Sequence, residues 1–252
     1  MPAASPVGIQ VAPFRSVADA REAPAILRAR AERHGYLFCP GLLSPRAVHE
    51  LRDAVLALAR DLGWLDPAVP WRSGRAIPGI ALGAYDDPRW IEFLRVMLGH
   101  PSFTSLRADP GLLAMLGTIL GGSAESDAGD FLRVVSADRP EHTTVAHQDH
   151  FYLPGISPRW TVWVPLGDCP LSLGPLALWP GSHAEGLQPH QGPSSSQRAV
   201  DVPSGTVWAA QDLAAGDILV FHWLTVHRAL PNQSSGNLRL SATYRYRAVG
   251  TT

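Results

Sequence analysis

Lysine is absent from this chain of 252 residues: all 21 of its basic residues are arginine. This absence excludes a lysine Schiff base and a lysine anion clamp, so a cation that binds an anionic ligand here must be an arginine. Cysteine is scarce too, with Cys39 and Cys169 and no CxxC spacing. A zinc knuckle and a thiol redox pair are therefore excluded, and we expect two buried free thiols.

Long apolar runs and an excess of charge are also missing. No apolar stretch is long enough to span a bilayer, and the start of the chain, from Met1 to Phe14, lacks the basic region and apolar core of a signal peptide. The net charge is −1, so no global field attracts nucleic acid or an anionic membrane. We expect a cytoplasmic protein whose partner is a small-molecule substrate; the sequence leaves its oligomeric state open.

The composition that is present is that of a globular protein, 46% hydrophobic and 17% charged, and suffices for one sizeable core. We predict a single domain over residues 1–252, with a mainly helical buttress and cover loop in 1–125 and the core in 126–250. The stretch 64–88 is either a functional cover or a surface excursion. Apolar spacing and Pro/Gly punctuation predict helices over 18–34, 44–62, 88–98 and 110–120.

From residue 130 onward the chain consists of short β-branched or aromatic segments bounded by Pro, Gly, Asp or Ser. Strands are predicted over 131–137, 143–149, 159–166, 176–179, 205–209, 217–222 and 238–247, with an earlier one at 36–39. Helices first and strands afterwards favour a mainly β fold with N-terminal helices, a double-stranded β-helix (jelly roll, cupin-like) buttressed by helices. The Pro- and Ser-rich stretch 184–203 is expected to be a long loop.

His147 and Asp149 are separated by one residue in the predicted strand 143–149. Alternate side chains of a strand share a face, so the pair would deliver an imidazole nitrogen and a carboxylate to one point. Two histidines and one carboxylate suit non-haem iron(II), because they leave the opposite coordination positions open. A bare His-x-Asp pair also arises by chance, and each of the ten histidines is equally compatible with a local hydrogen-bonding role.

The third ligand would come from a late strand, where His222 and His227 both qualify by spacing. Arg239 and Ser241, which follow on one face of the strand 238–247, favour His227. An arginine there can grip a carboxylate through two parallel hydrogen bonds. Alternation alone, however, is also typical of an exposed polar face that binds nothing.

An ordered series of motifs runs through residues 130–247 and carries a family resemblance. They are His147-Gln148-Asp149 with Tyr152 and Pro154, Trp163, Gly174-Pro175-Leu176, Trp179-Pro180-Gly181-Ser182-His183, Leu187-Gln188-Pro189-His190, Gly216-Asp217, His227, Pro231-Asn232 and Arg239. In this order they resemble the phytanoyl-CoA dioxygenase family of iron(II)/2-oxoglutarate-dependent oxygenases. The N-terminal half is similar only in broad pattern, as helices that would cover the major sheet.

The resemblance implies a role for each matching residue. The implied catalytic iron(II) ligands are His147, Asp149 and His227, and the implied 2-oxoglutarate contacts are Arg239, Ser241 and Trp163. Arg239 would pair with the far carboxylate of 2-oxoglutarate, and O2 would be the oxidant. Related halogenases replace the carboxylate of Asp149 with a small residue, so its presence implies hydroxylation.

Four histidines outside this set receive no catalytic role. His183 is expected to be mainly structural, and His150 would point to the strand face opposite the ligand pair. No role is assigned to His142 and His190.

The expected activity is hydroxylation, or another oxidation, of an unactivated C–H bond of a small organic molecule, a specialised metabolite. Trp64, Trp71 and Trp208, near predicted loops, would suit an apolar or ring-bearing substrate. Three alternatives stay open. An acyl-CoA hydroxylase would need cations for the CoA phosphates, for which the candidates are Arg72, Arg75 and Arg198. A jelly-roll metal enzyme without 2-oxoglutarate and a non-catalytic binding module are the others.

Overall fold

A computed structural model describes residues 9–18, 22–80, 82, 87–137, 143–155, 158–192 and 198–250. Parts of the predicted segments 18–34, 64–88 and 184–203, and His142, lie outside these residues. Within them, no helix combines the length and the apolar composition needed to cross a membrane.

Proline sets where the long helices begin. Each of the first five has proline in its first turn, where a missing N–H costs nothing and φ is already helical. Asp87 and Asp109 cap two of them by accepting hydrogen bonds from the backbone N–H groups of Arg89 and Leu112. The helices are α1 (Pro24–His34), α2 (Pro45–Asp61), α3 (Pro88–Leu98), α4 (Pro101–Arg107), α5 (Pro110–Leu120) and α6 (Asp149–Tyr152).

The strands form a large sheet, a small sheet and a two-stranded ribbon. The large sheet has the order β2-β10-β5-β12-β3, with β4 also paired to β12, and the small sheet has the order β1-β9-β6-β11. Within the described residues the sheets do not close into a barrel. The strands are β1 (Gln10–Ala12), β2 (Tyr36–Cys39), β3 (Ala124–Ser126), β4 (Phe131–Val135), β5 (Trp160–Pro165), β6 (Leu176–Leu178), β7 (His190–Gln191), β8 (Ala199–Val200), β9 (Val207–Ala209), β10 (Ile218–His222), β11 (His227–Ala229) and β12 (Arg239–Ala248).

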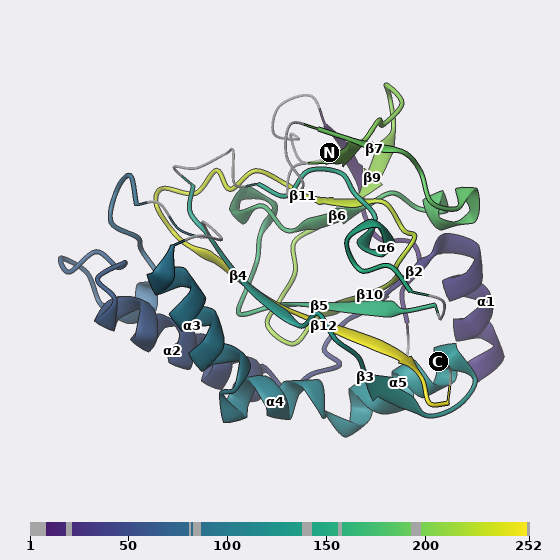
Figure 1. The fold of residues 1–252 in the computed structure, drawn as a ribbon, viewed down its shortest axis with the longest axis horizontal. Helices are drawn as coiled ribbons and strands as arrows, with labels where there is room; N and C mark the ends of the chain where they lie inside the picture. The colour runs from purple at the N-terminus through teal and green to yellow at the C-terminus, as the bar shows by residue number, and fades with distance from the viewer. Residues whose placement is uncertain are drawn as a thin grey trace.

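The large sheet separates two apolar layers. Its outer face packs on α2, α3, α4 and α5, which lie along one side of β5, β10 and β12 in Figure 1, while β6, β11 and α6 lie on the other side. Leu51, Phe93 and Leu116 of the helices share one core with Val220 and Tyr244 of the sheet. A second core, between the two sheets, includes the following buried side chains: Phe14, Trp163, Leu178, Leu219 and Phe221.

Strand β12 places its two sets of side chains as its alternation predicts. Leu240, Ala242 and Tyr244 are in the core shared with the helices, whereas Arg239 and Thr243 line a space on the opposite side. The predicted fold class, a jelly roll of the cupin type buttressed by helices, is confirmed.

Several predicted elements differ. Residues 143–149 are not a strand: His147 makes one isolated bridge with His227, and Asp149 begins α6. The stretch 184–203 is not simply a loop, because it contributes β7 and β8. These segments are too short to carry a periodic signal, and their pairing partners are distant in sequence.

Candidate iron and 2-oxoglutarate site

Two imidazoles meet where His147 and His227 exchange backbone hydrogen bonds, both 2.9 Å long. Their ring centroids are 4.2 Å apart. Nδ1 of His147 lies 2.8 Å from the carbonyl oxygen of Val145, and Nδ1 of His227 lies 3.0 Å from that of Thr225. A carbonyl can only accept, so each Nδ1 carries the proton and each Nε2 keeps a free lone pair, which is the form that binds a metal.

Asp149 reaches the same point from the first turn of α6. Its Oδ1 lies 3.8 Å from Nε2 of both His147 and His227. The donor atoms of the three residues all lie within 4.8 Å of one another, close enough to hold one ion. The chemistry that we predicted for the His-x-Asp pair is thus supported, but its geometric basis was wrong, because a helix start and not strand alternation aims the carboxylate.

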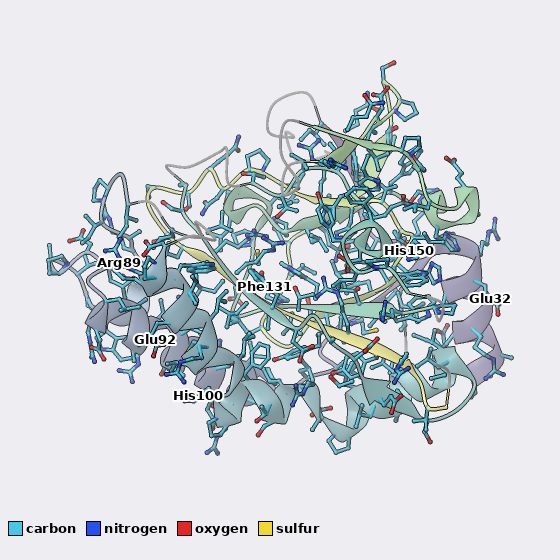
Figure 2. The ribbon with its side chains drawn as sticks, in the orientation of Figure 1. Glu32, Arg89, Glu92, His100, Phe131 and His150 are labelled. Atoms are coloured by element: carbon cyan, nitrogen blue, oxygen red, sulfur yellow. The ribbon has the colours of Figure 1, made fainter. Side chains whose placement is uncertain are left out.

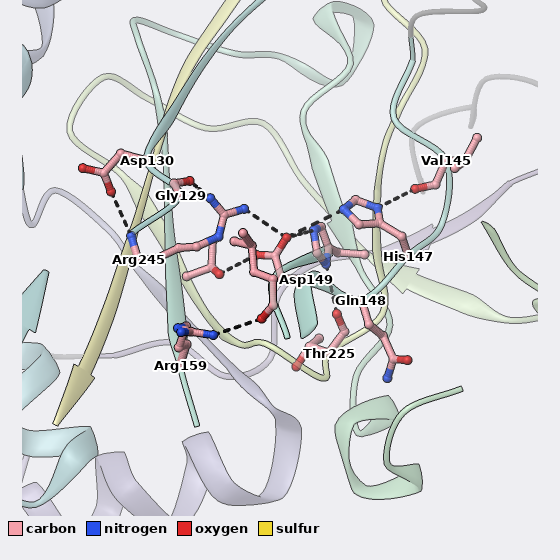
Figure 3. A network of polar contacts seen from close by, with 12 residues as sticks. Gly129, Asp130, Val145, His147, Gln148, Asp149, Arg159, Thr225 and Arg245 are labelled. Atoms are coloured by element: carbon pink, nitrogen blue, oxygen red, sulfur yellow. Dashed lines mark hydrogen bonds and ion pairs between the residues drawn. The ribbon is translucent and has the colours of Figure 1, made fainter. Parts of the chain in front are cut away.

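Two neighbours orient the Asp149 carboxylate (Figure 3). The hydroxyl of Thr161 donates to Oδ2 at 2.5 Å, and Nη2 of Arg245 donates to Oδ1 at 3.1 Å. Arg245 is itself held by the carbonyl of Gly129. Such outer contacts fix the direction in which a ligand presents its lone pairs.

Burial sets the protonation of the three residues. His147, Asp149 and His227 are at most 6% exposed. Burial lowers the pKa of His147 to about 3 and also lowers the pKa of His227, so both rings are neutral at pH 7. Burial opposes ionisation of Asp149, but Arg245, the two imidazoles and the Thr161 hydroxyl together outweigh it and hold the pKa of this carboxyl below its usual value. All three residues are therefore ready to bind a cation.

A carboxylate receptor lies beside these residues. Arg239 is 1% exposed and Ser241 is 0% exposed, yet Nε, Nη1 and Nη2 of the arginine and Oγ of the serine have no hydrogen-bond partner within the described residues. A buried unpaired guanidinium is costly. The donor set fits the far carboxylate of 2-oxoglutarate, which would satisfy it with two parallel hydrogen bonds.

A narrow space lies beside Arg239 and the three ligands, and it adjoins a cavity of about 580 Å³ with which it shares the lining residues Arg133, His147 and Asp149. Trp163 of β5 lines the narrow space together with Arg239. The large cavity extends from His147 and Asp149 to Phe131 and Leu153. Its volume is in the range of small-molecule sites.

Three further histidines, among those that the structure describes, lie outside this space. His222, the rival third ligand, packs against Trp160 on the helix side of the large sheet, with ring centroids 5.5 Å apart. Nε2 of His183 lies 2.8 Å from the carbonyl oxygen of Glu32, a structural contact. His150 does turn away from the ligands, but through its place in α6, where its ring packs on Trp223.

Gln148 was not recognised from sequence, although it stands between two ligands. It is fully buried, and its Nε2 donates to the carbonyls of Gly186 and Leu224 at 2.8 and 2.7 Å. Its Oε1 accepts from the backbone N–H of Gln188, and its own N–H donates to Nε2 of His190. His190 thus has a positioning contact that its sequence context did not reveal.

The tryptophans proposed to suit a ring-bearing substrate do not line the cavity. Trp64 is packed in the helical core on Trp90 and Phe93. Trp71 lies under the guanidinium of Arg72, and Trp208 is buried. That prediction was wrong, because these tryptophans are ordinary packing residues.

The chain belongs to the phytanoyl-CoA dioxygenase (PhyH) family, whose sequence profile matches residues 31–241. It is therefore an iron(II)/2-oxoglutarate-dependent dioxygenase, as the resemblance implied. The 1-deoxypentalenic acid 11-beta-hydroxylase of Streptomyces exfoliatus is 27% identical, over 85% of this chain and 77% of the relative.

Solved structures agree on the fold. The 2-oxoglutarate-dependent epimerase SnoN of nogalamycin biosynthesis is 25% identical, with a TM-score of 0.57 over 89% of this chain and 83% of that one. EvdO2 of Micromonospora carbonacea var. aurantiaca is 20% identical, with a TM-score of 0.62 over 95% of this chain and 94% of that one. At this identity EvdO2 supports the fold alone.

Proposed function

We propose that this enzyme oxidises an unactivated C–H bond of a specialised metabolite, and that the outcome is hydroxylation. The observation that carries the proposal is the buried, unpaired donor set of Arg239 and Ser241 beside a His-Asp-His cluster. The hydroxylase relative, named for 1-deoxypentalenic acid, and the epimerase of nogalamycin biosynthesis support a small-molecule substrate.

In this proposal His147, Asp149 and His227 hold iron(II), and Arg239 with Ser241 binds the far carboxylate of 2-oxoglutarate against Trp163. With O2, the bound pair supplies the oxidising power for C–H functionalisation and yields succinate and carbon dioxide. Thr161 and Arg245 keep the Asp149 carboxylate ionised and directed at the two Nε2 atoms. The carboxylate at this position favours hydroxylation over halogenation.

The large cavity then holds the substrate next to the ligand cluster, with Tyr152 and Leu153 in its lining. We propose that residues 1–252 act as one oxygenase domain, with 126–250 as the catalytic core and 1–125 mainly as its buttress. The described part of 64–88 supports a packing role over a cover, since none of it lines the cavity and Trp64 is in the core. The cytoplasmic location stays a prediction.

An acyl-CoA substrate has weaker support. Of the three arginines suggested for the CoA phosphates, Arg72 is paired with Asp53 and Arg75 lies 3.7 Å from Asp66, and neither lines the cavity. Arg198 lies nearer, since its carbonyl accepts a hydrogen bond from Tyr152, which lines the cavity, but one cation is a poor receptor for a multiply charged group.

The proposed cosubstrate is tested by loading the purified protein with iron(II) and 2-oxoglutarate without oxygen. The complex should develop a visible charge-transfer band, and an Arg239→Met variant should need much more 2-oxoglutarate to develop it. A wild-type protein without a band would refute the cosubstrate sites. A screen of candidate metabolites for succinate formation then identifies the substrate.

A further inference from the structure

Four charged side chains line the large cavity, and one of them lacks a counter-ion. Asp130 pairs with Arg107 at 2.9 Å, and Asp149 pairs with Arg245 at 3.1 Å. Across the part of the chain that the structure describes, no carboxylate lies within 4.0 Å of the guanidinium of Arg133. The guanidinium carbon of Arg133 lies over the ring of Phe131, 4.9 Å from its centroid.

Arg133 occupies the junction between the two parts of the cavity. It lies on β4 directly opposite Ser241 of β12, so both side chains face the interior. It lines the narrow space beside Arg239 and also the large cavity. Phe131, two residues earlier on the same face, is partly buried and is drawn near the middle of the view in Figure 2, whereas Arg89 and Glu92 are exposed.

The local charge also favours a further anion. Three guanidinium groups, of Arg133, Arg239 and Arg245, face the single carboxylate of Asp149. Arginine does not lose its proton in proteins, so this excess of two positive charges is permanent. Iron(II) and the 2-oxoglutarate dianion cancel each other and leave the excess unchanged. A neutral substrate would leave this excess of positive charge unchanged, whereas an anionic substrate would reduce it.

We propose that Arg133 anchors a carboxylate of the substrate, which makes the substrate class an apolar carboxylic acid. This inference rests on the proposed function and narrows it. The guanidinium binds the carboxylate at the inner end of the large cavity. The apolar remainder of the molecule lies against Phe131, Val145 and Leu153, with Asp149 and His147 on one side.

The cosubstrate could compete for the same guanidinium, because it carries carboxylates of its own. Arg239 and Ser241 already offer a complete, buried donor set for the far carboxylate. Arg133 is only half-buried and opens to the large cavity, where a second molecule would lie. The experiment must therefore separate the two sources of carboxylate.

The test measures binding by calorimetry to protein loaded with nickel(II) and 2-oxoglutarate, which does not turn over. The probes are three compounds with one rigid apolar cage: adamantane-1-carboxylate, 1-adamantanemethanol and 1-adamantylamine. Wild type should bind the acid best. Arg133→Met should weaken the acid by about 10- to 100-fold, the cost of a charge-assisted hydrogen bond, and leave the alcohol unchanged. Arg133→Glu should reverse the order and favour the amine.

The matched control is Arg247→Met, which removes a cation from β12, the strand that pairs with β4. Arg247 does not line the cavity, and its guanidinium pairs with Glu125 at 3.0 Å. It should leave the affinity for all three probes unchanged. Thermal unfolding of each variant shows whether it is folded, and a misfolded Arg133→Glu leaves the Arg133→Met comparison to decide.

Three results would overturn the inference: no binding of the acid by wild type, equal binding of acid and alcohol, or an Arg133→Met protein that loses 2-oxoglutarate affinity and keeps its affinity for the acid. The last would assign Arg133 to the cosubstrate. The same titrations on metal-free protein separate this inference from the proposed function. If the protein binds no 2-oxoglutarate even when it is loaded with nickel(II), but the metal-free protein still prefers the acid in a way that depends on Arg133, the proposed function is refuted and the anion site is upheld.

Discussion

Buried polar side chains on the two faces of the large sheet differ in whether they have hydrogen-bond partners. On the helix side, the hydroxyls of Tyr244 and Tyr246 donate to the carbonyls of Phe103 and Arg107 at 3.1 and 2.7 Å. On the cavity side of the same strand, Arg239 and Ser241 are equally buried but leave their donors unpaired. Satisfied groups stabilise the fold, whereas unpaired ones lower its stability unless a ligand binds. The contrast therefore separates the functional face from the structural one.

The largest difference between the two faces is expected from variants of the metal ligands. Asp149→Ala or His227→Ala should abolish iron binding and turnover, because two donors remain and, in the aspartate variant, Arg245 is left as an uncompensated cation. His222→Ala, on the helix side, should keep its iron. Metal content after anaerobic loading and desalting measures both. Iron retained by His227→Ala but lost from His222→Ala would move the third ligand to the other face.

Arg239→Met should produce the next largest effect. The affinity for 2-oxoglutarate should fall by about 2–5 kcal/mol, since the far carboxylate loses its buried partner. The metal-free variant should be as stable as wild type or more so, because an unpaired buried charge has been removed. Urea unfolding of the metal-free protein and a 2-oxoglutarate titration measure the two quantities. A variant that is several kcal/mol less stable would mean that the guanidinium has a structural partner.

A pH titration probes the helix side. Burial lowers the pKa of His222 from 6.5 to about 4, so the unfolded chain binds the extra proton between these values. The stability that neutral His222 contributes is therefore complete above pH 6.5 and is lost as the pH falls towards 4. At about 1.36 kcal/mol per pKa unit, the loss is at most about 3 kcal/mol. His222→Gln should flatten this part of the stability profile of the metal-free protein, measured by urea unfolding.

The smallest effect is expected from Tyr244→Phe. It removes one hydrogen bond to the Phe103 carbonyl and should destabilise the protein by about 1 kcal/mol, with no change in 2-oxoglutarate affinity. The same two measurements on Arg239→Met should give the opposite result, a loss of 2-oxoglutarate affinity without a loss of stability. A weaker 2-oxoglutarate affinity in this variant would show that the two faces are not independent.

Sequence predicted the strands of the large sheet well where alternation or apolar content was continuous. Residues 238–247 and 217–222 correspond to β12 and β10, whose side chains separate cleanly between the two faces. The four-residue helix α6 and the two-residue strands β7 and β8 were missed, because segments so short have no measurable period. Their conformation is imposed by distant parts of the chain.

The same limit applies to the site. The spacing of the motifs brought forward His147, Asp149, His227, Arg239, Ser241 and Trp163. The structure gathers all of them except Ser241 around one space, and Ser241 lies two residues after Arg239 on the same strand. Arg245 shares the polar face of β12 with Arg239 and was visible in the alternation, but its pairing with Asp149 depends on the course of α6. The partners of Gln148 lie 38, 40 and 76 positions away, which no local pattern encodes.

These bonds of Gln148 also bear on how the protein folds. Residues 147–149 take their final course only when the segments around Gly186 and Leu224 have closed on the same amide group. Contacts so far apart in sequence form late, because loop closure must precede them. A nascent chain that ends before Leu224 therefore has two of the three ligands but lacks the Gln148 bond to Leu224 and the backbone bonds between His147 and His227. Metal capture should mark the end of folding, and iron added during refolding should not accelerate it.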